Sequence, residues 1–152
     1  MALNNLGARI KLHKVDPSGP LLPLDQLGID HADFTMCNPP FFSSKADMQA
    51  THLTKKRSPS AVCSGADVEM ITEGGDLGFV MRMLEESMVF KEKIQWYSSM
   101  LGKLSSATKL VEALKERGIS NFAVTSLQAG NVTKRWAVAW SFADLRPKNV
   151  SH

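Results

Sequence analysis

The sequence contains little cysteine and no long apolar run. Its two cysteines, Cys37 and Cys63, lie far apart and form no Cys-x-x-Cys pair, so neither a zinc site nor a disulfide framework is indicated. Reduced thiols of this kind are typical of an intracellular protein. No stretch approaches the length of a membrane span, and the N-terminus has no apolar signal-peptide region. We therefore expect an intracellular protein that holds no metal and does not cross a membrane.

An excess of one charge is also missing. The 18 Lys and Arg residues outnumber the 15 Asp and Glu residues only slightly, for a formal net charge of +3 and a pI near 9.0. This balance permits an anionic partner but does not require one. The 152 residues suffice for one domain with a buried core, and a hydrophobic fraction of 43% is that of an ordinary globular protein.

The most informative motif is Asn38-Pro39-Pro40-Phe41, which directly follows the strand-like run 34–37. The Asn38 side-chain carbonyl and the Pro39 backbone carbonyl can accept the two N–H hydrogens of an amino group and turn its lone pair toward a methyl donor. The prolines restrict φ and stiffen the loop, and Phe41 offers a ring face to a splayed-out base. An ordinary turn is the alternative. The position after a strand and ahead of a long amphipathic helix favours a ligand site.

The N-terminal half is predicted to hold few regular elements. Residues 9–15 alternate apolar and polar side chains, which predicts a half-buried strand. A short helix is expected within 21–28 and a second strand over 33–37. Residues 43–70 lack sustained periodicity, so we predict a long loop. Its basic segment Lys55-Lys56-Arg57 either is a solvated tip or grips phosphate.

The C-terminal half is predicted to alternate helices and strands. Asp76 is expected to cap a helix that runs to about Lys93. One stripe of that helix is apolar at helical spacing: Leu77, Val80, Met81, Leu84 and Met88. A strand over 94–101 follows, and then a second helix that Ser105 or Ser106 caps and Gly118 ends.

An antiparallel hairpin of strands 121–127 and 135–142 is predicted at an edge of the sheet. Along its second strand large and small side chains face opposite ways, and we expect a helix to pack closely on the small face. The large face carries Trp136, Val138, Trp140 and Phe142, and the small face Ala137, Ala139 and Ser141. The tail 144–152 is predicted to be flexible.

Four separated blocks of this sequence resemble the methyltransferase-10-domain family. They are 34–42 (Phe-Thr-Met-Cys-Asn-Pro-Pro-Phe-Phe), 72–75 (Thr-Glu-Gly-Gly), 96–103 (Trp-Tyr-Ser-Ser-Met-Leu-Gly-Lys) and 135–142 (Arg-Trp-Ala-Val-Ala-Trp-Ser-Phe). The family contains RNA adenine-N6 methyltransferases that act on spliceosomal small nuclear RNA, and bacterial relatives that act on large-subunit ribosomal RNA. The resemblance implies an α/β, class I (Rossmann-like) S-adenosylmethionine-dependent methyltransferase fold over residues 1–143, and a protein of the nucleus or cytoplasm.

The resemblance also implies roles for individual residues. Asn38 and Pro39 would hold the adenine amino group on a loop that Pro40 stiffens, and Phe41 would stack on the base. Asn38 and Ser18 would lie near S-adenosylmethionine. Residues bordering the substrate would be Phe42, Thr72, Glu73, Gly74, Gly75 and Met100. Lys103, with Lys55, Lys56 and Arg57, would meet phosphates of a structured RNA, in binding that weakens with added salt.

A related fungal branch methylates a small indole-ethylamine, and the sequence also resembles that branch, including Ala46-Asp47-Met48-Gln49. The small-molecule enzymes tend to have Tyr at the position of Phe42 and Asn at that of Met100. Phe42 and Met100 resemble the RNA-directed version, so RNA is favoured over a tryptamine-type amine. A catalytically inactive RNA-binding module is a third alternative.

The Gly-rich cofactor turn of such methyltransferases is absent, because no two glycines in the chain are separated by a single residue. The chain is expected to begin at the family's third strand. In the class I order 3-2-1-4-5-7-6, the first two strands lie between the third and the fourth. We therefore expect an incomplete fold that lacks these two strands, is inactive alone, and can self-associate through the exposed edge at 33–37.

Overall fold

The computed structural model describes residues 7, 9–54, 70–129 and 133–146. Its centre is a four-stranded sheet of order β1-β2-β4-β3. The strands are β1 (Ala32–Phe34), β2 (Ile94–Leu101), β3 (Phe122–Ala129) and β4 (Thr133–Trp140). β1 and β2 are parallel, and the other two pairs are antiparallel. This order corresponds to strands 4-5-7-6 of the expected class I sheet, so the predicted fold class is confirmed.

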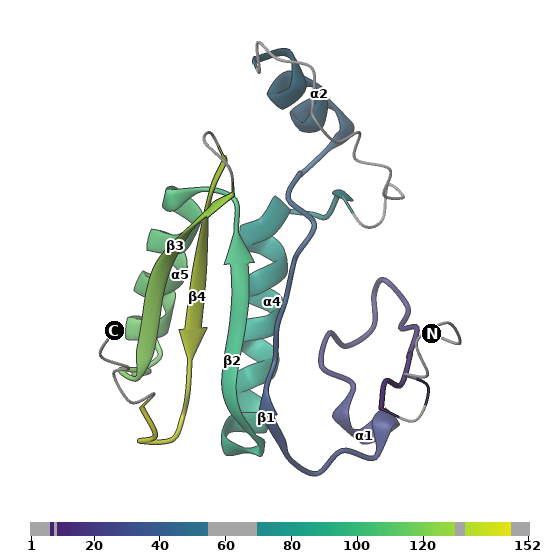
Figure 1. Cartoon of the computed structure of the whole chain (residues 1–152), viewed down its shortest axis with the longest axis vertical. Coiled ribbons are helices and arrows are strands. Elements are labelled where there is room, and N and C mark those ends of the chain that lie inside the picture. The colour runs from purple at the N-terminus through teal and green to yellow at the C-terminus, as the bar shows by residue number, and fades with distance from the viewer. Residues whose placement is uncertain (1–6, 8, 55–69, 130–132, 147–152) are drawn as a thin grey trace.

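Two helices, α4 (Gly75–Phe90) and α5 (Leu104–Glu116), pack on one face of the sheet (Figure 1). The core between these layers contains Val80 and Leu84 of α4, which lie on the predicted apolar stripe. Trp140 of β4 is fully buried there, and its indole N–H donates a hydrogen bond to the Ser87 hydroxyl at 3.0 Å. Its ring stacks on Tyr97, with centroids 5.7 Å apart. Burial raises the pKa of the Tyr97 hydroxyl, which donates to the Lys91 carbonyl.

The helices cover the large face of the hairpin, which carries Val138 and Trp140. The expectation that a helix packs on the small face is therefore wrong for α4 and α5. Large apolar side chains fill the space between helix and sheet, and their burial outweighs the closer approach that alanines allow. The hairpin itself is confirmed, with a ladder that extends to Ala129 and Thr133.

Residues 9–15 form no strand, contrary to the prediction. Most of these side chains are exposed, and His13 hydrogen bonds with Gln26 of the segment that follows. Alternation describes a surface that suits a sheet, but a strand also needs a neighbour whose backbone groups it can pair with. The short predicted helix is present as α1 (Leu24–Leu27) and ends at Gly28.

The predicted loop 43–70 contains a helix, α2 (Lys45–Thr54), so that prediction is wrong over these residues. The Ser44 hydroxyl accepts the Asp47 N–H, and the Asp47 carboxylate in turn accepts the Ser43 N–H. This reciprocal pair satisfies amides that have no partner within the helix. Residues 55–69 lie outside the described part of the chain.

Three predicted helix boundaries also differ from the structure. Helix α4 begins at Gly75, after Gly74 in the left-handed region, and Asp76 belongs to its first turn. It ends at Phe90, where a 3₁₀ turn, η2 (Lys91–Lys93), begins. Helix α5 begins at Leu104 without a side-chain cap, because Ser106 is turned toward Asp76 instead. At the start of both helices a contact with another element replaces the expected local cap.

The predicted exposed edge is present at β1. Among the residues that the structure describes, only β2 pairs with β1, and the Phe34 and Met36 side chains are 63% and 82% exposed. No helix of the described residues is long and apolar enough to cross a membrane. Within those same residues, no group of three or more acidic, His or Cys side chains could hold a metal ion.

Candidate active site

The Asn-Pro-Pro-Phe loop follows β1, at the end of the sheet where the parallel strands β1 and β2 have their carboxyl ends (Figure 1). The Cys37 N–H donates to the Ser98 carbonyl at 3.1 Å, and the Cys37 carbonyl accepts the Met100 N–H at 2.9 Å. Beyond the loop, Phe42 pairs in the same way with Met70 and Thr72 at 3.0 and 2.9 Å. Residues 38–41 are therefore held at both ends by backbone hydrogen bonds.

Within this loop the prolines are buried and the asparagine is exposed. Pro39 is among the fully buried side chains, so the stiff part of the loop is packed against the protein. Asn38 makes no side-chain hydrogen bond with any residue that the structure describes. Its carboxamide is thus free to accept a hydrogen bond from a ligand, beside a backbone that cannot easily move.

The Phe41 ring is partly buried in a slot formed by three other segments. A Cβ added at Gly102 would lie 3.1 Å from Phe41 Cδ1, so a larger residue there would push on the ring. A Cβ added at Gly75 would lie 3.3 Å from the Phe41 carbonyl oxygen. The Arg135 guanidinium of β4 lies 4.8 Å from the ring centroid, which is within cation–π range. We call Phe41, Gly75, Gly102 and Arg135 the Phe41 slot.

Most of the predicted substrate-bordering residues come together around this loop. Thr72 binds the Phe42 backbone, Gly75 borders Phe41, and Met100 binds the Cys37 carbonyl. Glu73 and Gly74 lead into α4 and are exposed. A Cβ added at Gly78 would lie 2.3 Å from the Glu73 carbonyl, so this turn packs tightly on the helix.

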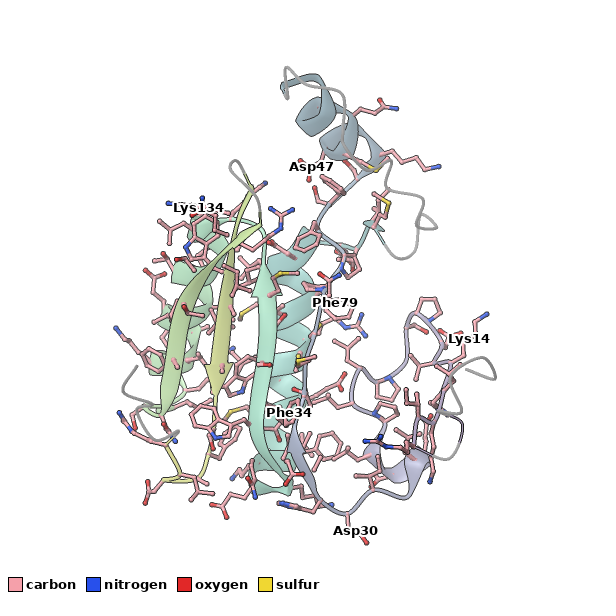
Figure 2. The ribbon with its side chains drawn as sticks, viewed as in Figure 1. Lys14, Asp30, Phe34, Asp47, Phe79 and Lys134 are labelled. Carbon is pink, nitrogen blue, oxygen red and sulfur yellow. The ribbon has the colours of Figure 1, made fainter. Side chains whose placement is uncertain are left out.

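Lys103 lies at the start of α5 and is exposed. The pKa of the Asp47 carboxyl is lowered chiefly by the Ser43 N–H and hydroxyl, and to a smaller extent by the charge of Lys103. Lys103 and the start of α2 are therefore close enough to interact. Lys134 is at the same end of the sheet (Figure 2). Lys55, Lys56 and Arg57 lie outside the described residues.

Ser18 lies in a turn in which its N–H and hydroxyl both donate to the Asp16 carboxylate. This turn is tied to α4 by Arg82, which donates to the Gly19 carbonyl at 3.0 Å, and by Glu86, which accepts the Leu21 N–H. The turn that contains Ser18 is thus attached to Arg82 and Glu86 in the later turns of α4, whereas Phe41 is bordered by Gly75 at the start of this helix.

Cys37 is partly buried against the core, and burial raises the pKa of its thiol, with an opposing hydrogen bond from Ser99. A thiol in this state is not a nucleophile at neutral pH. Its interpretation as a small packing residue is consistent with this environment.

Arg135, Gly102 and Asp76 are not predicted as site residues from the sequence. All three reach Phe41 or its neighbours from segments more than thirty residues further along the chain. No local spacing signals such a contact. The resemblance to a family was the only signal that covered the stretches holding Arg135 and Gly102.

Comparison with known proteins identifies relatives of this chain. A family model described as RNA methyltransferase matches residues 1–144. The chain is 42% identical over 146 residues to the U6 small nuclear RNA (adenine-(43)-N(6))-methyltransferase of Schizosaccharomyces pombe, covering 96% of this chain and 36% of that protein.

Solved structures of methyltransferase domains are also similar to this chain. The human METTL16 catalytic domain in complex with MAT2A 3′UTR hairpin 1 has a TM-score of 0.80 and 40% identity, over 94% of this chain and 50% of that one. The N-terminal domain of human METTL16 in complex with SAH has a TM-score of 0.67 and 35% identity, over 94% and 45%. The chain thus spans about a third of its yeast relative and about half of each solved domain.

Proposed function

Since the chain belongs to the methyltransferase-10-domain family of RNA methyltransferases, we propose that it forms the amino-acceptor half of an RNA adenine-N6 methyltransferase site. The observation that carries this proposal is that the Asn-Pro-Pro-Phe loop is rigid and exposes its asparagine. Asn38 is exposed and has no side-chain partner among the described residues, while Pro39, Pro40 and the Phe41 slot hold the loop rigid. A rigid acceptor beside a braced aromatic ring suits an extruded base.

The adenine amino group is a weak nucleophile because its lone pair is delocalised into the ring. The Asn38 carbonyl and the Pro39 backbone carbonyl would accept its two hydrogens and orient the lone pair. Phe41 would stack on the base, and Phe42 and Met100 would border it. Because these groups belong to a loop that is already ordered, little reorganisation is needed as the base enters.

S-adenosylmethionine is the proposed methyl donor, and it would supply an electrophilic methyl group on a sulfonium sulfur. Asn38 fits the methyl end of this cofactor, because its side chain is exposed and uncommitted. The Ser18 hydroxyl is engaged by Asp16, so it would contact a cofactor only after giving up that hydrogen bond. The N-terminal domain of human METTL16 has been solved in complex with SAH, which supports a site for this class of cofactor in the family.

The proposed substrate is a structured RNA of the small nuclear type. Relatives are named for U6 small nuclear RNA or solved with an RNA hairpin, which favours RNA over the small-amine alternative. Lys103 precedes α5, Arg135 lies over the Phe41 ring, and Lys134 is at the same end of the sheet (Figure 2). These three basic side chains would contact phosphates. Ribosomal RNA is the second candidate substrate. We also propose a nuclear location and self-association through the β1 edge.

The test is methyl transfer from labelled S-adenosylmethionine. The chain is assayed alone and in place of the matching 146 residues of the fission-yeast relative, on an RNA hairpin and on tryptamine. We expect transfer to the hairpin in the chimera, and Asn38→Ala to reduce it by at least about a hundredfold, as for loss of an oriented acceptor. Asp25→Ala, an exposed change in α1, is the matched control. Transfer that survives Asn38→Ala unchanged would contradict the proposal.

A further inference from the structure

Asp76 is a buried carboxylate that the proposed reaction does not use. It is 6% exposed in the first turn of α4, and both of its oxygens accept hydrogen bonds from the β2–α5 region. Oδ2 accepts the Gly102 N–H at 2.6 Å, and Oδ1 accepts the Ser106 hydroxyl at 2.9 Å. A buried carboxylate is costly unless it is well hydrogen bonded, so this arrangement holds α4 and the start of α5 together firmly.

The two glycines that border Phe41 are both attached to Asp76. Gly75 precedes it in the chain and lies against the Phe41 carbonyl, while Gly102 is its hydrogen-bond donor and lies against the Phe41 ring. A Cβ added at Gly102 would be 3.1 Å from the ring and 3.3 Å from Asp76 Oδ2, so Gly102 borders both the ring and the carboxylate. Asp76 therefore links the two glycines that border Phe41, one at its backbone carbonyl and the other at its ring.

We propose that Asp76 is a positioning residue that sets the pose of the Phe41 ring for the base, an inference that rests on the proposed function. It does not touch the substrate; it acts through Gly102 and Gly75. When the carboxylate is removed, Gly102 is no longer tied to α4, and the ring loses the wall that aligns it. The Arg135 guanidinium still lies over the ring, but a cation–π contact tolerates sliding and tilting.

The pose of the ring is measured by NMR on the whole chain. Nuclear Overhauser effects between the Phe41 ring protons and the Gly102 Hα atoms report the contact directly. We expect them in the wild type, a loss of them in Asp76→Ala, and their retention in Asp76→Asn, whose carboxamide oxygen still accepts the Gly102 N–H. Asp25→Ala is the control, and thermal unfolding establishes that each variant is folded. Retention of these effects in Asp76→Ala would overturn the proposal.

The consequence for the base is measured by fluorescence anisotropy with two RNA hairpins. One has a single unpaired adenosine in its loop, and the other has an abasic site at that position. Stacking on Phe41 should make the adenosine hairpin bind more tightly by on the order of tenfold. Phe41→Ala and Asp76→Ala should each abolish this preference, and the double variant should lose no more. Gly102→Ala, which pushes on the ring with Asp76 intact, should have the same effect.

A merely structural role for Asp76 predicts a different result. Asp76→Ala would then weaken both hairpins equally and add to the effect of Phe41→Ala, which would refute the inference. If the wild type shows no preference for the adenosine hairpin, the proposed function fails. The NMR comparison of Asp76→Ala with Asp76→Asn still decides the role of Asp76 in that case.

Discussion

Ser87→Ala should destabilise the helix–sheet layer on which the site rests. The Ser87 hydroxyl is fully buried, donates to the Leu84 carbonyl at 2.7 Å and accepts the Trp140 indole N–H at 3.0 Å. Alanine leaves that N–H buried without an acceptor, which costs about 1–3 kcal/mol. Alanine's better helix propensity returns only a few tenths of a kcal/mol. For a domain of this size, each kcal/mol lowers Tm by about 2–4 °C.

A double-mutant cycle separates this cost from general loss of packing. Trp140→Phe removes the N–H, so Ser87→Ala in that background should cost less than about 0.5 kcal/mol, which gives a coupling energy of about 1–2 kcal/mol. Urea unfolding followed by the fluorescence of Trp96 and Trp136 measures all four proteins. Ser120→Ala, an exposed serine, is the control. Equal destabilisation by Ser87→Ala in both backgrounds would refute the argument from the unpaired indole.

Two further predictions concern the cap of α2 and the sheet edge. The hydrogen bonds from Ser43 lower the pKa of the Asp47 carboxyl in the folded protein. The stabilisation of the α2 N-terminus by ionised Asp47 is therefore present above the ordinary carboxyl pKa of 3.8, and it is lost as the pH falls through the lower pKa of the folded state. Hydrogen exchange at the Ser43 amide should accelerate below that pH and in Asp47→Ala at all pH values, whereas a rate independent of both would contradict the capping. At the β1 edge, Phe34→Lys with Met36→Lys should reduce any concentration-dependent association seen by analytical ultracentrifugation, since charged side chains block edge pairing. Association that persists in this double variant must use another surface.

The sequence correctly predicted the elements in which the spacing of apolar side chains agrees with the tertiary packing. Val80 and Leu84 recur at helical spacing and are buried in α4, and β2 and the hairpin have their predicted places. The failures have physical causes. Residues 9–15 alternate correctly but have no strand beside them. The Ser44–Asp47 cap was a readable signal, yet the polar composition of 43–70 favoured a loop.

In the candidate site, too, the local features could be predicted and the long-range contacts could not. The loop 38–41 could be predicted because its chemistry is contained in four consecutive residues. Its surroundings could not, because Gly102 and Arg135 reach Phe41 across more than sixty residues of chain. Asp76 shows the reason most clearly, since a residue that resembles a local helix cap is instead bonded to Gly102 and Ser106. Local rules describe what a side chain can bond to, but the tertiary fold decides which partner it has.

The layer of α4 and α5 therefore has two tasks that rest on separate contacts. Its core, with Ser87 and Trp140, holds the helices on the sheet, and its upper end, with Asp76, holds the walls of the Phe41 slot. Ser87→Ala should consequently leave the slot intact below its unfolding transition, because the hydrogen bonds of Asp76 join the two helices independently. Asp76→Ala should disturb the Phe41 ring in a protein that is still fully folded.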